Sequence, residues 1–251
     1  MSFRDELERL VRLQATELQV RALQSELDAL PAAREACQGR VLEAEAAVEA
    51  AELAREESHK EHRRLEGELQ EAEAQIVKYK EQEMLVKTNQ QLWAIQDEIK
   101  TVEDRIGGTE EAIIEQLEAG DTLSAAIAAR NQELATAKAE AAVEITEIDG
   151  HEKELSEKLD LGRGEASDLR AGTAPELVSF YDRIAAVRGG IAIAEGVEGR
   201  CTACNVRLRP QIWVQVRNVA APQQCDACKR IVFARETLSL PSTVRVGDAG
   251  S

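Results

Sequence analysis

Aromatic side chains are scarce in this chain of 251 residues, at 3%, although apolar residues reach 43%. A thick globular core relies on large aromatic side chains, whereas a narrow seam between helices can be built from alanine and leucine. Alanine, leucine, glutamate, glutamine and arginine dominate the first two thirds of the sequence. This composition indicates long helices rather than a large globular domain.

Long apolar runs are also missing, and we expect no leader segment. No stretch of about 18 consecutive apolar residues occurs, which argues against a membrane-spanning helix. The first seven residues contain no apolar core of a signal peptide. We therefore expect a cytoplasmic protein with no membrane partner. Thiols stay reduced in the cytosol, where paired cysteines are more often metal ligands than disulfides.

Positive charge is in short supply through residue 174. This part contains 21 Lys and Arg against 40 Asp and Glu, whereas the rest contains 10 against 7. The formal net charge of the whole chain is −16. Because phosphate binding needs a surplus of cations, the acidic part is unsuited to nucleic acid and only the C-terminal part could bind it.

A first helix is predicted from about residue 4 to residue 83, where apolar residues recur at spacings of three and four. Pro31 removes a backbone donor, so we expect a kink or break there. The register that follows is weak in its middle, because Arg55, Ser58 and His62 occupy seam positions. Such a seam is poor for a stable, isolated two-stranded coil.

The pattern resets in a turn near residues 84–90. Thr88 and Gln91 have the spacing of a capping box, which marks a helix start. After it comes the clearest heptad seam of the chain. We expect an interruption at Gly107 and Gly108, and a restart that Asp121 could cap. The seam residues are Leu92, Ile95, Ile99, Val102 and Ile106.

The two helical segments have similar lengths, which favours an antiparallel hairpin over a parallel dimeric coil. Folding back near residue 87 pairs positions whose numbers add to about 175, and this register places Gly67 opposite Gly108. The predicted fold is mainly α, a long antiparallel helical hairpin with a small C-terminal zinc ribbon. Residues 1–172 form the antiparallel coiled-coil hairpin in this interpretation.

Glycines at 162, 164 and 172 are expected to loosen the chain before a connecting helix in residues 173–194. Thr173 and Glu176 have the spacing of a second capping box, with Pro175 in the first turn. This helix should end near Gly189 and Gly190. A zinc ribbon is predicted in residues 195–240, with a strand at 231–233, and a disordered tail in 241–251.

Four of the five cysteines form two C-x-x-C pairs, Cys201 with Cys204 and Cys225 with Cys228, separated by twenty residues. Each pair can present two sulfurs from one tight turn, and two such turns make a tetrahedral four-sulfur site that suits zinc. We predict one structural Zn²⁺. With four protein ligands the coordination is closed, which argues against a catalytic metal.

The cysteine region is basic, with seven Lys and Arg against two acids over residues 199–236. In one interpretation, the one that we favour, these cations balance the thiolates and Trp213 belongs to a small core. In the other, they form a face that contacts a partner or nucleic acid, with Trp213 stacking on a base. The candidate contact residues are Arg200, Arg207, Arg209, Trp213, Arg217, Lys229 and Arg230.

No arrangement typical of an enzyme is found. His59, His62 and His151 are interpreted as ordinary polar residues of helices, and Cys37 as a packing or surface thiol. A nucleophile motif and a phosphate-binding glycine loop are both missing. We expect no catalytic residue and no small-molecule substrate.

Three stretches resemble a widespread bacterial family of coiled-coil proteins with a C-terminal C4-type zinc ribbon. The first is residues 86–99, VKTNQQLWAIQDEI, where Gln91 and Leu92 replace the acidic-aromatic pair usual in the family and an aromatic follows at Trp93. The second runs from Phe180 to Ala194. The third is 201–233, with RLRPQ from Arg207 and CDACKRI from Cys225.

The resemblance implies a long antiparallel hairpin, often hooked, with a zinc ribbon at its base. Some relatives are chaperones or adaptors for the alternative sigma factor of flagellar and secretion genes, and others are linked to RNA or to secretion proteins. From the residues we predict a non-enzymatic protein that binds protein partners, and with the resemblance we expect a zinc-ribbon coiled-coil adaptor or chaperone-like protein. The alternative function is RNA or DNA binding through the basic ribbon.

Overall fold

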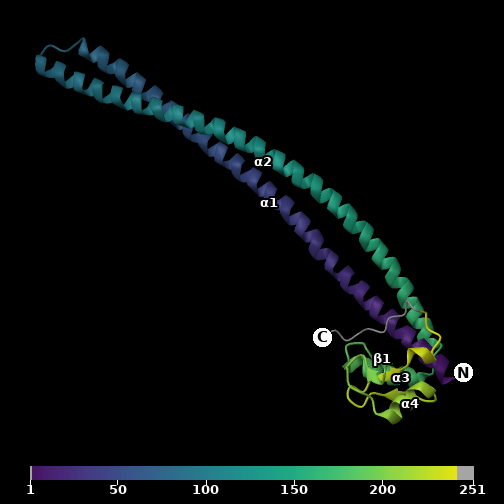
Figure 1. Cartoon of the computed structure of the whole chain (residues 1–251). Coiled ribbons are helices and arrows are strands. Elements are labelled where there is room, and N and C mark those ends of the chain that lie inside the picture. Colours follow the sequence, from purple (N-terminus) through teal and green to yellow (C-terminus); the bar gives the residue numbers. More distant parts are fainter. Residues whose placement is uncertain (1, 242–251) are drawn as a thin grey trace. The chain divides into compact units, whose positions relative to one another are not determined.

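Two very long helices dominate the chain, whose computed structural model describes residues 2–241. Helix α1 spans Phe3–Glu83 and helix α2 spans Asn89–Ala171, and residues 84–88 form the turn between them (Figure 1). The shorter elements are α3 (Pro175–Val187), β1 (Ile193–Val197), β2 (Arg200–Cys201), α4 (Pro210–Asn218), β3 (Gln223–Gln224), β4 (Ile231–Phe233) and the 3-10 helix η1 (Arg235–Thr237). The predicted tail lies in residues that are almost all outside the described ones.

The chain forms two compact units. The arm unit is residues 34–146, which contains the turn and the adjoining parts of α1 and α2. The base unit combines the start of the chain, residues 1–33, with residues 147–251. All the strands therefore share a unit with the first turns of α1, a division that the sequence did not suggest.

Within the arm unit α1 and α2 run antiparallel, as the hairpin prediction requires. Apolar side chains form a seam next to the turn, where Ala72 and Ile76 of α1 pack against Ile99 and Val102 of α2. Thr88 caps α2, because its Oγ1 accepts a hydrogen bond of 3.3 Å from the Gln91 amide. The hairpin fold, the heptad seam and this cap are confirmed.

The middle of the arm is poorly packed, as its polar seam predicts. No residue of 49–64 or of 103–126 is buried. Ser58 contacts Gln116 across the helices at 3.0 Å. The predicted register was approximate, because Arg40 bonds Glu144, nine positions away from the expected sum of 175. Neither Gly67 nor Gly108 has an atom of another part of the chain within 4 Å of an added Cβ, so their expected position opposite each other stays a prediction.

Several expected helix interruptions are absent from the described residues. Helix α1 runs through Pro31 without a break, and Gly107, Gly108 and Asp121 all lie inside α2. Because Pro31 is exposed, the carbonyl group that loses its amide partner can be hydrated. A glycine costs a helix only about 1 kcal/mol relative to alanine, which seam packing on either side can offset.

The end of α2 also differs from the prediction. The helix continues past Gly162 and Gly164 to Ala171, so these glycines do not loosen it. The N-cap of α3 is Ala174, without a side-chain hydrogen bond, and not Thr173. Thr173 is buried and its Oγ1 donates to the Leu169 carbonyl at 2.8 Å, which holds the hydroxyl against the last turn of α2. Helix α3 ends before Gly189 and Gly190, as predicted.

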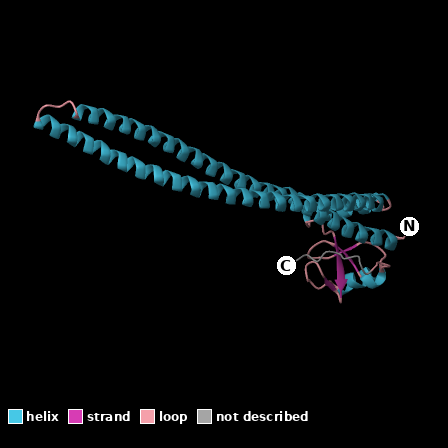
Figure 2. Ribbon diagram, turned by 90° about the horizontal axis from the view of Figure 1, so that it is seen from above, coloured by secondary structure: helices cyan, strands magenta, loops and turns pink. Residues whose placement is uncertain are grey.

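The strands, magenta in Figure 2, form one small sheet. Their order in the sheet is β2-β1-β4-β3. Strands β1 and β4 are parallel, pairing Ile193 with Ile231, and the two outer pairs are antiparallel. The predicted strand at 231–233 is β4. One face of this sheet packs against the start of α1, and the cluster there contains Leu10, Leu13, Tyr181, Ile193 and Phe233.

Candidate metal centre

Two turns of nearly identical geometry carry the four cysteines. In the first, the Cys201 amide donates to the Val206 carbonyl at 3.0 Å, and the Asn205 amide donates to the Cys201 carbonyl at 2.8 Å. In the second, the Cys225 amide donates to Arg230 at 2.9 Å and the Lys229 amide to Cys225 at 2.8 Å. The same closed turn is therefore built twice, once after β2 begins and once between β3 and β4.

The residue that follows each pair has a left-handed backbone. Asn205 has a φ of 58° and Lys229 a φ of 64°. This conformation is rare for side chains other than glycine and asparagine, and it turns the chain sharply. As a result the next amides, of Val206 and Arg230, donate hydrogen bonds to the sulfurs of Cys204 and Cys228. Amide donors of this kind stabilise thiolate charge.

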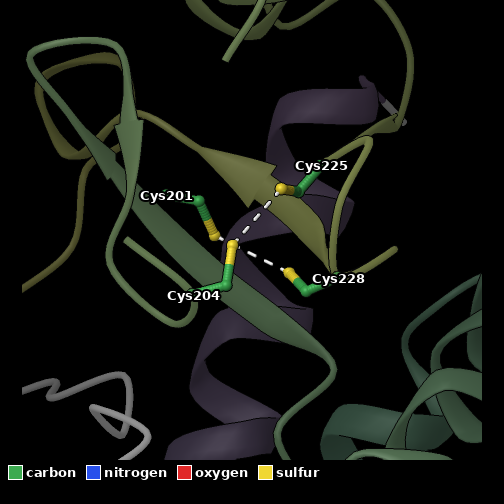
Figure 3. Close-up of side chains that lie close together, drawn as sticks. All are labelled: Cys201, Cys204, Cys225 and Cys228. Atoms are coloured by element: carbon green, nitrogen blue, oxygen red, sulfur yellow. Dashed lines mark hydrogen bonds between the residues drawn. The ribbon is translucent and has the colours of Figure 1, made fainter. Parts of the chain in front are cut away.

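The four side chains converge on one point (Figure 3). Their sulfur atoms all lie within 4.8 Å of one another, with 3.8 Å between Cys201 and Cys228 and 3.6 Å between Cys204 and Cys225. Four sulfurs at about 2.3 Å from a common ion in tetrahedral geometry lie about 3.8 Å apart. A disulfide requires about 2.05 Å. The arrangement therefore fits a four-thiolate metal site.

Burial and local donors act on the thiols in opposite directions. Cys201, Cys225 and Cys228 are buried and Cys204 is partly exposed. Burial raises the pKa of the Cys201 thiol. Burial also acts to raise the pKa of Cys228, but hydrogen bonds from the amide and guanidinium of Arg230, together with those of Cys204 and Cys225, outweigh it and lower the pKa to about 7. Arg230 thus favours the ligand form of Cys228.

A small apolar cluster packs around the four cysteines. Leu208, Val216 and Val232 are buried with the cysteines, and Trp213 of α4 packs against them. Gly196 permits this packing, because an added Cβ would lie 2.7 Å from the Trp213 ring. Helix α4 was not predicted, although Pro210 occupies the first helical turn, where proline is favoured. Trp213 is a half-buried core residue here, in line with the interpretation that we favoured from the sequence.

Only part of the predicted basic face is free. Arg209 pairs with Asp226 at 3.2 Å, and Arg217 pairs with Glu236 at 3.7 Å. Arg230 is buried and donates to the Ile191 carbonyl at 2.8 Å. Of the candidate contact residues, all of which the structure describes, Arg200, Arg207 and Lys229 are exposed and form no ion pair.

Cys37 belongs to the arm unit and is not one of the four clustered cysteines. It is buried, and its Sγ donates to Glu144 Oε2 at 2.8 Å, beside the Arg40 guanidinium. The bond to Glu144 and burial both raise the pKa of the thiol. Of the two sequence interpretations, a packing thiol rather than a surface thiol is correct.

The sequence did not point to Gln14, which ties α1 to the cysteine-bearing sheet. This side chain is fully buried, and it both accepts from the Ile193 amide at 2.6 Å and donates to the Ile193 carbonyl at 2.9 Å. The only available signal was a glutamine within a stripe of buried leucines. Strand β2 pairs only with Gly196 and Val197 of β1. Gln14 therefore takes the place of a neighbouring strand at Ile193, where β2 makes no hydrogen bonds.

A second missed cluster joins three helices of the base unit. Arg170 of α2 forms ion pairs with Glu17 of α1 and with Asp182 of α3. Tyr181 donates from its hydroxyl to Glu17 at 2.7 Å, and burial followed by this bond raises its pKa. Side chains from distant parts of the sequence therefore fix the segment that leads into the metal centre.

A family model, the CT398-like coiled coil hairpin domain, matches residues 13–189. The chain belongs to this family. The matched range of this CT398-like protein covers most of α1, all of α2 and all of α3. No curated protein that was compared matches the sequence.

Solved structures show the same fold. CT398 from Chlamydia trachomatis has a TM-score of 0.81 and 19% identity, over 93% of this chain and 99% of that chain. HP0958 from Helicobacter pylori has a TM-score of 0.57 and 17% identity, over 94% and 99%. A protein from Mycobacterium smegmatis has a TM-score of 0.52 and 19% identity, over 89% and 98%.

Among the described helices of this CT398-like chain, none has the apolar length that a bilayer crossing requires.

Proposed function

We propose that this protein is a non-enzymatic, cytoplasmic adaptor that binds protein partners through the end of its hairpin and carries a structural zinc at its base. The observation that carries the proposal is the apolar surface at the turn. Met84 is 86% exposed, Leu85 77% and Trp93 69%. Large exposed apolar side chains that lie together mark surfaces for partners.

The charge around these side chains supports the same function. Residues 84–96, which we call the tip, contain Lys87 and no carboxylate, although the chain has 47 acids among its 251 residues. A hollow there is lined by tip residues, with Gln82 beside them. The tip residues that line it are Leu85, Val86, Gln91, Ala94 and Ile95. An apolar surface without carboxylates can be desolvated by a partner at little cost, unlike the acidic remainder of the arm.

Exchange of tip residues provides the first test. Leu85→Gln with Trp93→Gln removes two large apolar contacts, each contributing about 1.5–3 kcal/mol when fully buried, so partner recovery should fall at least about tenfold. The matched control is Leu161→Gln, because Leu161 is also 77% exposed but lies in the base unit. Quantitative mass spectrometry of proteins purified with the tagged full-length chain measures recovery.

The outcomes separate the function from its location. If no protein is recovered in stoichiometric amount with the unaltered chain, the adaptor function is wrong. If a partner is recovered equally by the double variant and the control, the partner binds elsewhere and the tip assignment is wrong.

The donor set supports zinc as the metal. Four thiolates in tetrahedral array suit Zn²⁺, and closed coordination leaves no position for water or substrate. Titration of the purified protein with a thiol-reactive mercurial should therefore release about one zinc per chain, complete after about four equivalents. A dye that absorbs on binding zinc follows the release, and elemental analysis identifies the ion. Metal-free protein with four readily titrated thiols would contradict the assignment.

Nucleic-acid binding is not proposed, because no observation favours it over partner binding. Arg200, Arg207 and Lys229 are the cations left for phosphate contacts, and Trp213 is occupied in the core. A sigma-factor role also stays a prediction, since likeness to solved structures at 17–19% identity reflects the fold alone.

A further inference from the structure

A cavity of about 740 Å³ opens in the base unit between α1, α2 and α3. Its volume is in the range of sites that hold small ligands or peptide side chains. Val20, Ala166, Ala185 and Ala186 supply small apolar side chains to its wall. Neither the metal centre nor the tip uses this cavity.

Two of the three arginines around the cavity lack an acidic partner. Arg170 is neutralised by Glu17 and Asp182. Arg21 donates to the Gly189 carbonyl at 2.7 Å, and Arg163 donates to the Gln24 amide oxygen at 2.7 Å. Neither of these two guanidinium groups has an ion pair within residues 2–241. This is notable in a segment with 40 acids against 21 cations through residue 174.

The backbone holds Arg21 in place. Gly190 has a φ of 87°, and an added Cβ there would overlap the Arg21 guanidinium. A glycine is therefore required both by the backbone conformation and by the close approach of the arginine. Because Arg21 uses one N–H group on the Gly189 carbonyl, its remaining donors are available to a ligand.

We propose that this cavity binds a short acidic segment of a protein partner, with an aliphatic side chain between two carboxylates. The inference rests on the proposed adaptor function and adds a second contact to it. Guanidinium groups bind carboxylates with paired hydrogen bonds, which assigns the carboxylates to Arg21 and Arg163. The aliphatic side chain fits the wall formed by Val20 and the alanines. A free phosphate would leave that apolar wall without a contact.

The net charge of the protein sharpens this assignment. A chain of charge −16 repels acidic peptides at long range, so nonspecific electrostatic attraction cannot produce binding. Saturable binding of an acidic peptide must then come from a local cationic site.

The probe is a fluorescein-labelled peptide mixture in which Asp or Glu, then Leu or Val, then Asp or Glu stand between glycine-serine flanks. Its anisotropy is measured with the zinc-loaded full-length protein. We expect saturable binding that weakens at least tenfold with Arg21→Gln plus Arg163→Gln. A peptide mixture with Asn and Gln in place of the acids should also bind at least tenfold more weakly to the unaltered protein. Ala166→Leu, which fills the cavity without changing charge, should also weaken binding.

The charge-matched control is Arg105→Gln plus Arg130→Gln, since both arginines are exposed on α2 in the arm unit. It should bind the acidic peptides like the unaltered protein. Equal loss in this control, or no binding by any acidic peptide at millimolar concentration, overturns the proposal. Equal competition by inorganic phosphate also overturns it, because the site would then be a simple anion site. A partner recovered equally by the cavity double variant refutes this contact while leaving the adaptor function intact.

Discussion

Replacing Cys204 with serine should remove the metal and unfold the residues around it, from 193 to about 240. Serine is a poor zinc ligand, and the metal contributes on the order of 10 kcal/mol to the folding of such sites. The apolar cluster with Leu208, Val216 and Val232 is too small to fold without a cross-link, which the proposed ion would provide. We expect amide protection in β1 and β4 to be lost at pH 7.

The effect should reach α1, because Leu10 and Leu13 pack against Ile193 and Phe233. Hydrogen exchange with mass spectrometry should therefore show reduced protection in the first turns of α1. Residues 34–146, which form the other compact unit, should keep their protection. Cys37→Ser is the control, since this thiol bonds Glu144 and is not a ligand. Full zinc content with unchanged exchange in Cys204→Ser would refute the role of the metal.

The hairpin and the cysteine cluster were predictable because their signals are local and repetitive. The seam of Ile95, Ile99, Val102 and Ile106 repeats over several turns, and C-x-x-C places two sulfurs in one turn whatever surrounds them. A repeated pattern of this kind can still be recognised when a single residue departs from it. The fold and the candidate ligands followed from them.

The helix interruptions were mispredicted because single-residue propensities were read without packing. Single glycines and prolines make a helix less stable. Helix α2, of 83 residues, nevertheless continues through Gly107 and Gly108, and helix α1, of 81 residues, continues through Pro31. Thr173 failed as a cap for a different reason, because its hydroxyl bonds the Leu169 carbonyl in the last turn of α2 and Ala174 takes the N-cap position. Side chains of threonine compete between such partners, and the sequence does not show which one wins.

The contacts of the base unit were beyond the sequence because they join residues far apart in the chain. Gln14 meets Ile193, and Glu17 meets Arg170 and Tyr181, across separations of more than 150 residues. Without the fold, these side chains are ordinary polar residues of a helix. The cavity near Arg21 and Arg163 depends on the same long-range packing.

Gln14→Leu should be the most damaging change outside the cysteines. Gln14 satisfies both the N–H and the C=O of Ile193 at a position that water does not reach. Leucine has a similar size but leaves both groups without a partner, and each such loss costs about 1–3 kcal/mol. We expect the base unit to lose about 2–6 kcal/mol of unfolding free energy, a large share of a typical domain's total.

Urea unfolding followed by Trp213 fluorescence measures this loss, in a Trp93→Phe background so that only the base unit reports. Gln19→Leu is the control, because Gln19 is exposed on the same helix. Gln14→Glu separates hydrogen bonding from size. Its carboxylate cannot donate to the Ile193 carbonyl, but the protonated acid can, so stability should recover as the pH falls. The stability of Gln14→Leu should show no such recovery at low pH. If Gln14→Leu and Gln19→Leu are equally stable, the paired hydrogen bonds do not hold α1 to the sheet.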